Sequence, residues 1–132
     1  MTESTISVKD EVARIFQRLK MGELSQTDTT PQSGWEIPLP SGRIVTRSTL
    51  QAEARVLMAL GSDAVPHLLP HVMNDNLALR YVAIYTLEQI TGEKPYLPYF
   101  DQADHGKNRP RAIEVWRRWY EARIKSEGGT FD

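Results

Sequence analysis

Apolar residues recur every three or four positions along much of the chain, which is the spacing of a helix with one buried face. The first such stretch has apolar side chains at Val8, Val12, Ile15, Phe16 and Leu19. Ser7 can cap its start, because a short side-chain oxygen accepts from the free amides of the first turn. Gly22 can end it in the left-handed conformation that other residues adopt at a cost. We predict an N-terminal helix over residues 8–21.

Residues 22–47 interrupt this pattern with many Ser, Thr, Pro and Gly residues, so they predict an irregular insertion. Apolar side chains alternate from Trp35 to Leu39, and a Ser-Gly pair follows, which would allow a small hairpin over residues 35–46. Two prolines remove backbone donors from that stretch. We therefore favour an ordered loop over the hairpin, with Trp35 filling a gap in a helical core.

Helical spacing returns over residues 48–125, and short polar residues precede each apolar run. Such residues mark helix starts because they satisfy the first free amides. The residues predicted to cap three further helices are Ser48 with Gln51, Asp63, and either Asp75 or Asn76.

Prolines and glycines predict where these helices bend and end. Pro66 falls in a first turn, where its missing amide has no effect, whereas Pro70 lies deeper and should bend its helix. Gly92 should end the next helix. The last helix is predicted to start near Pro110, a preferred first-turn residue, and to reach Lys125.

The segment 59–90 resembles a HEAT-like repeat of the type also called phycobilisome-lyase-like. The residues that carry the resemblance are Ala59-Leu60-Gly61, Ala64-Val65-Pro66, Leu68-Leu69, Asp75, Leu79-Arg80, Ala83, Thr86-Leu87 and Ile90. A Trp-rich final helix after an Ile-Thr-Gly break is also similar to the ends of such proteins, so the resemblance spans about residues 48–125.

The resemblance implies an all-α fold in which residues 1–132 form a single domain. One helical hairpin cannot bury its own apolar face, so such units stack. We therefore expect a short right-handed α-solenoid of about two HEAT-like helical hairpins, with flanking capping helices at both ends. In the family, the residues at the positions of Asp75 and Arg80 pair within or between units, so we expect structural roles for both.

Composition excludes several classes of protein. The chain has no cysteine, which rules out disulfides, thiolate nucleophiles and cysteine-ligated zinc. A net charge of −1 argues against a dedicated binder of nucleic acid or of a membrane surface. No apolar run approaches the length of about 20 residues that a membrane span requires, and the first residues lack the pattern of a signal peptide. We expect a cytoplasmic protein.

Two polar clusters are candidates for a chemical site. Asp63, His67 and His71 are spaced four apart, as helical metal ligands can be, but Pro70 distorts that spacing and all three point away from the apolar stripe. The acidic segment 101–105 is too polar to predict a catalytic cleft. We therefore expect solvated side chains, no metal, no cofactor and no enzymatic activity.

The last helix carries an excess of positive charge, with seven Lys or Arg against two Glu between residues 107 and 125. Arg111, Arg117 and Arg118 are candidate phosphate contacts of a nucleic-acid-binding module. However, its tryptophans share a helical stripe that is typical of a core, so we disfavour nucleic acid as the partner.

A second stripe on the fourth helix is the candidate for binding another protein. It consists of Tyr81, Ile84, Tyr85 and Glu88, opposite the expected core face, and Trp35 can join it. A helix that is apolar on both sides is either fully buried or offers one side to a partner. The alternative is that Trp35 or the loop 93–108 covers the stripe.

We accordingly predict a non-catalytic scaffold, adaptor or regulator that binds a protein as a monomer or a weak homodimer. Two other functions stay open. One is the nucleic-acid-binding module. The other, implied only by the family resemblance, is a lyase or chaperone-type subunit for a tetrapyrrole-bearing protein.

Overall fold

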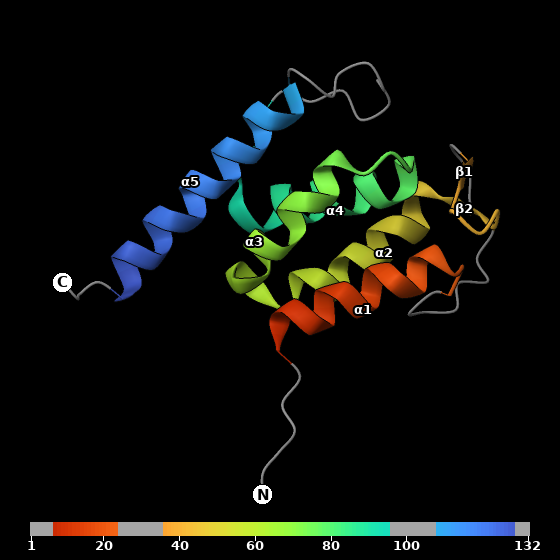
Figure 1. Ribbon diagram of the computed structural model, residues 1–132, viewed down its shortest axis with the longest axis horizontal. Coiled ribbons are helices and arrows are strands. Elements are labelled where there is room, and N and C mark those ends of the chain that lie inside the picture. The colour runs from red at the N-terminus through yellow and green to blue at the C-terminus, as the bar shows by residue number, and fades with distance from the viewer. Residues whose placement is uncertain (1–6, 24–35, 96–107, 129–132) are drawn as a thin grey trace, which may run out of the picture.

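Helices make up most of the structure, and a single two-stranded sheet is present in the part of the chain that is described (Figure 1). The computed structural model describes residues 7–23, 36–95 and 108–128. The elements in chain order are α1 (Val8–Lys20), β1 (Glu36–Pro38), β2 (Ile44–Thr46), α2 (Arg47–Met58), the 3-10 helix η1 (Gly61–Ala64), α3 (Val65–Leu68), the 3-10 helix η2 (Leu69–Met73), α4 (Leu77–Thr91) and α5 (Asn108–Gly128). The predicted helical character is confirmed.

Helix α1 begins and ends where its local chemistry predicts. The Asp10 N–H donates to Ser7 Oγ at 3.1 Å, which confirms the N-terminal cap. Gly22 follows the helix with a φ of +82°, and the Glu23 N–H donates back to the Arg18 carbonyl at 2.8 Å. The four buried side chains are Val12, Ile15, Phe16 and Leu19. They form the single apolar face that the spacing indicates.

The stretch before α2 forms a hairpin, so our preference for an ordered loop was wrong. Strands β1 and β2 pair antiparallel, with Ile37 opposite Val45. The Leu39 N–H donates to the Arg43 carbonyl at 2.8 Å and closes the turn. The alternating apolar side chains are all buried, namely Ile37, Leu39 and Val45. Their burial stabilises the hairpin by more than the loss of the backbone hydrogen bonds that the prolines cannot donate. Trp35 lies outside the described residues.

The hairpin is attached to the end of α1. Arg43 Nη1 donates to the Gly22 carbonyl at 2.7 Å. A Cβ at Gly22 would lie only 2.6 Å from Ser41 Oγ, so the turn of the hairpin approaches the glycine closely. Gly22 therefore serves both the left-handed backbone and this close approach.

Two predicted helix caps are wrong, because at both places the preceding element runs directly into the helix. Strand β2 leads directly into α2, so Thr46 takes the cap position and Ser48 is left exposed within the helix. Gln51 donates to the Tyr81 hydroxyl instead of closing a capping box. Asp63 lies inside η1, and Ala64 before α3 is already helical, so no cap is needed there.

The prolines act as predicted. Pro66 is in the first turn of α3, and α3 ends at Leu68. From Leu69 the backbone continues as η2, a tighter 3-10 segment that contains Pro70. Since a proline in a helix interior removes one hydrogen bond and its ring clashes with the preceding turn, this break follows directly from the sequence.

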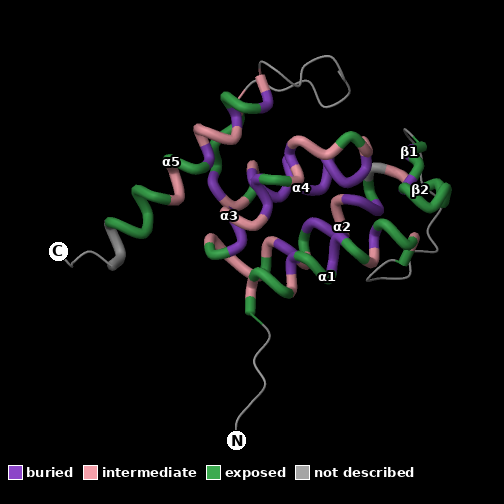
Figure 2. Tube along the Cα trace, in the orientation of Figure 1, coloured by how far each residue is buried: buried purple, intermediate pink, exposed green. Residues whose placement is uncertain are grey.

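Helix α4 lies at the centre of the molecule (Figure 2). Its buried residues are Ala78, Leu79, Arg80, Tyr81, Val82, Ala83, Ile84, Thr86, Leu87 and Thr91. The Leu79 N–H donates to Asn76 Oδ1 at 3.1 Å, which identifies Asn76 as the cap, and Gly92 ends the helix with a φ of +75°.

Arg80 is a fully buried charge that closes the turn before α4. Its Nη1 donates to the carbonyls of Asn74 at 2.9 Å and Asp75 at 3.3 Å. Burial lowers the pKa of Arg80 to about 10, and the positive charge of Arg109 acts in the same direction. The guanidinium remains charged at neutral pH and satisfies two carbonyls of the turn between η2 and α4.

We predict that Gly22→Ala destabilises the protein more than Gly92→Ala. Both variants force an L-residue into the left-handed region, at about 1–2 kcal/mol each. Only at Gly22 does the new methyl group meet a neighbour, because open space surrounds the position at Gly92. Urea unfolding measures both losses. Adding Ser41→Ala to Gly22→Ala should restore part of the difference, and equal losses at the two glycines would contradict the close approach.

Candidate binding surfaces

The predicted protein-binding stripe on α4 is largely inaccessible. Tyr81 is 5% exposed and Ile84 is 0% exposed. Helix α2 packs along α4, and Gln51 Nε2 from α2 donates to the Tyr81 hydroxyl at 2.9 Å. The prediction that these two side chains are free for a partner is wrong, because the elements packed against α4 bury both of them.

The rest of the predicted stripe forms the edge of the same packing. The Tyr85 ring lies parallel to the Tyr81 ring, with centroids 6.0 Å apart and an interplanar angle of 6°. Tyr85 and Glu88 are both half-buried. Trp35 and most of the loop expected to cover the stripe lie outside the described residues. The described part of the stripe therefore offers only a narrow rim.

The amino-terminal half of α5 anchors this helix to the body. Ala112 and Trp116 are both 0% exposed. The indole N–H of Trp116 donates to the Glu93 carbonyl, just past the end of α4, at 3.1 Å. The predicted role of the tryptophan stripe as core is confirmed at Trp116. The helix starts at Asn108, two residues before the predicted first-turn proline.

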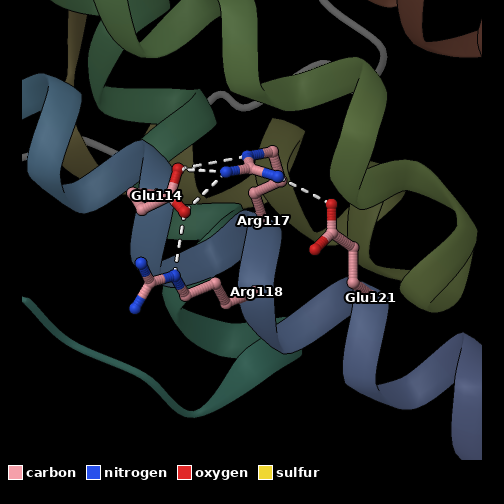
Figure 3. A network of polar contacts seen from close by, with 4 residues as sticks. All are labelled: Glu114, Arg117, Arg118 and Glu121. Atoms are coloured by element: carbon pink, nitrogen blue, oxygen red, sulfur yellow. Dashed lines mark hydrogen bonds and ion pairs between the residues drawn. The ribbon is translucent and has the colours of Figure 1, made fainter.

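The arginines proposed as phosphate contacts are engaged with carboxylates of the same helix (Figure 3). Arg117 pairs with Glu114, and its Nη1 lies 2.7 Å from Glu121 Oε2. Arg118 Nε lies 2.8 Å from Glu114 Oε2. Hydrogen bonds from Arg117 and Arg118 hold the pKa of Glu114 below its usual value. Arg111 is exposed near the helix start. A phosphate at Arg117 or Arg118 would have to compete with these carboxylates.

The carboxyl-terminal half of α5 extends beyond the other helices, and its last turns are mostly exposed (Figures 1 and 2). We call the side chains Trp119, Tyr120, Arg123 and Ile124 the distal face. Trp119 and Tyr120 are half-buried against the core, whereas Ile124 is 48% exposed. The Arg123 guanidinium lies 5.5 Å from the Trp119 ring centroid, and its Nε donates to Ser62 Oγ at 3.1 Å.

The two histidines line a cleft between α1 and the α3–η2 segment. The cleft measures about 220 Å³, and its lining residues are Lys9, Val12, Ala13, Pro66, His67, Pro70 and His71. Asp63 is not among them. The expectation that His71 is solvated was wrong, because its ring stacks on Phe16 with centroids 3.8 Å apart and an interplanar angle of 3°.

We predict that replacing Tyr81 destabilises the fold. Tyr81→Phe removes the hydrogen bond to Gln51 and should cost about 1 kcal/mol. Tyr81→Ala leaves a cavity and should cost about 3–5 kcal/mol. Urea unfolding checks both values. Tyr85→Ala is the matched control at a half-buried ring and should cost less. A Tyr81→Ala protein as stable as wild type would show that the ring is not core.

We predict that His71 makes stability depend on pH. Burial lowers the pKa of His71 below 6.5, and the nearby positive charge of Lys20 lowers it further. The unfolded state therefore binds a proton at a higher pH than the folded state does. The free energy of unfolding is then highest above about pH 6.5, where His71 is neutral in both states, and it decreases as the pH falls toward the folded pKa. Between about pH 7.5 and 5.5, the free energy of unfolding should change less with pH in His71→Phe than in wild type. His67→Phe keeps the stacked pair and should keep the slope.

Among the described helices, none is both long enough and apolar enough to cross a bilayer. No protein-family model, no curated protein and no solved structure matches the chain. The resemblance to HEAT-like repeats therefore stands on the residues of the sequence itself. Evidence on function comes from the geometry of the distal face and of the cleft.

Proposed function

We propose that the protein is a non-catalytic binding module that holds another protein against the distal face of α5. The observation that carries this proposal is the exposure of Ile124. Ile113, Tyr120 and Ile124 are spaced seven and four residues apart, so they lie on one side of the helix. Ile113 and Tyr120 pack against the core, but Ile124 is 48% exposed. The apolar line thus continues past the point where the body covers it.

The amino acids of the distal face suit a contact surface. Aromatic and Arg side chains are enriched at the centres of protein interfaces, where they combine apolar area with directional bonds. Arg123 is already positioned by Trp119 and Ser62, so a partner would meet a preorganised guanidinium. Ordering fewer side chains on binding lowers the entropic cost of association.

Charge around the distal face indicates the kind of partner. A hollow of about 260 Å³ lies along the distal half of α5 and is lined by Arg118, Glu121, Ala122 and Lys125. Between residues 117 and 125 of α5, four side chains carry positive charge and one, Glu121, carries negative charge. A protein surface with an apolar patch bordered by carboxylates is complementary to this arrangement.

The HEAT-like arrangement is part of this proposal. Helix α1 contacts α3 and η1, while α2 contacts α4. In a HEAT-like arrangement α1 would pair with α2 and α3–η2 with α4, and the contacts of α1 with α3 and of α2 with α4 support such a stacking of first members on first members and second on second. Helix α5 would then be the cap at one end, and its distal half would be the part of the cap that remains open to a partner.

We predict that Ile124→Asp abolishes partner binding and leaves the fold intact. A buried interface that centres on an apolar side chain loses on the order of tenfold or more in affinity when a charge enters it. The measurement is affinity capture with wild type and variants, followed by titration of the captured protein. Ile44→Asp is the matched control, since Ile44 on the hairpin is 54% exposed.

Capture of the same protein by wild type and Ile44→Asp, with loss for Ile124→Asp, supports the proposal. Equal binding by both variants contradicts it. A nuclease-sensitive complex would instead favour nucleic acid at the α5 arginines. Light scattering tests whether the distal face binds a second copy of the chain. A dimer that forms with rising concentration in wild type, but not in Ile124→Asp, would identify that second copy as the partner.

A further inference from the structure

The cleft between α1 and the α3–η2 segment brings together three nitrogen-bearing side chains from different elements. Lys9 comes from α1, His67 from α3 and His71 from η2, and all three line one space of about 220 Å³. The walls between them are Val12, Ala13, Pro66 and Pro70. Positively charged or hydrogen-bond-donating groups on an apolar floor are the arrangement that orients a small anionic ligand.

The cleft is held in shape by its surroundings. Val12 and Phe16 of α1 are buried in the core, and α1 packs directly against α3. The stacked contact with Phe16 fixes the plane of the His71 ring. The two prolines cannot rearrange their backbone freely. Apart from the exposed Lys9 side chain, little ordering is therefore left for a ligand to impose, which favours binding even by a small molecule.

Size limits the ligand. Sites for drug-sized molecules and cofactors occupy roughly 300–1,000 Å³, which exceeds the volume of this cleft. At the roughly 30 Å³ that one water molecule occupies in the liquid, the cleft holds about seven non-hydrogen atoms. A nucleotide or a tetrapyrrole is too large.

Charge selects the chemical class. No carboxylate is among the described residues that line the cleft, and Lys20 adds a further positive charge close to His71. An ammonium group and imidazole N–H groups form strong hydrogen bonds with a carboxylate. We infer that the cleft binds a small carboxylic acid with a short apolar stem, its carboxylate at Lys9 and the histidines and its stem against Ala13 and Pro66. This site is independent of the distal face.

The test is an NMR titration of the full chain with sodium butyrate, followed through the imidazole resonances of His67 and His71. We expect saturable shifts with a dissociation constant on the order of 1 mM for a ligand of six non-hydrogen atoms. Butyrate should also raise the pKa of His71, because a bound anion stabilises the imidazolium. Neutral butyramide should give neither effect, and inorganic phosphate, which has no apolar stem, should bind more weakly.

Lys9→Met tests the role of the Lys9 ammonium group, because methionine has an unbranched side chain of similar length but no charge. Lys9 is exposed, so the fold should be kept, and the affinity for butyrate should fall about tenfold. Lys94→Met is the matched control at an exposed lysine outside the cleft and should bind as wild type does. Unsaturable shifts, equal shifts with butyramide, or unchanged affinity in Lys9→Met would overturn the inference.

A second titration distinguishes a free carboxylic acid from an acidic side chain of a protein as the ligand of the cleft. The blocked tripeptide Ala-Glu-Ala carries the same carboxylate on a backbone that exceeds the cleft, so it should bind more weakly than butyrate. Tighter binding of the peptide would overturn the assignment to a small molecule and would make the cleft a contact for acidic protein segments.

Discussion

The fold depends on covering α4, a helix that is apolar on nearly every side. Burying apolar area contributes about 25 cal/mol per Å², so an uncovered face of such a helix would be a large loss of free energy. Helix α2 covers one side, α3 and η2 another, and β1, α1 and α5 complete the enclosure. The one buried charge within this helix, Arg80, is accommodated because it binds the carbonyls of the turn that precedes it.

The same constraint decides where function can reside. Tyr81 and Ile84 are buried in this packing, so they have no surface left for a partner. Accessible side chains lie at the periphery. One location is the end of α5 around Ile124, which extends beyond the other helices, and the other is the cleft between α1 and the α3–η2 segment. Both locations combine an apolar surface with positive charge, and they lie on different elements, so they can be occupied separately.

Local chemistry was predictable from the sequence, whereas contacts between distant segments were not. Ser7, Gly22, Asn76 and Gly92 act where their residue types predict, because caps and left-handed glycines depend on neighbouring backbone alone. Ser48 fails as a cap because a strand enters α2 directly. The hairpin forms because its apolar side chains reach a core that no local pattern reveals. Which side of α4 is open, and that His71 stacks on Phe16, likewise depend on elements far away in the chain.

The order of α4 and α5 along the chain also has a consequence for synthesis. Ala112 and Trp116 cover the other helices only after α5 has been synthesised. The end of α5 at Gly128 lies 37 residues after the end of α4 at Thr91. At a translation rate of about 5–20 residues per second, the apolar face beneath them stays open for roughly 2–7 seconds on every nascent chain. That interval is far longer than the roughly 1 μs in which a helix forms, so the helices before α5 have time to form while this face is still uncovered.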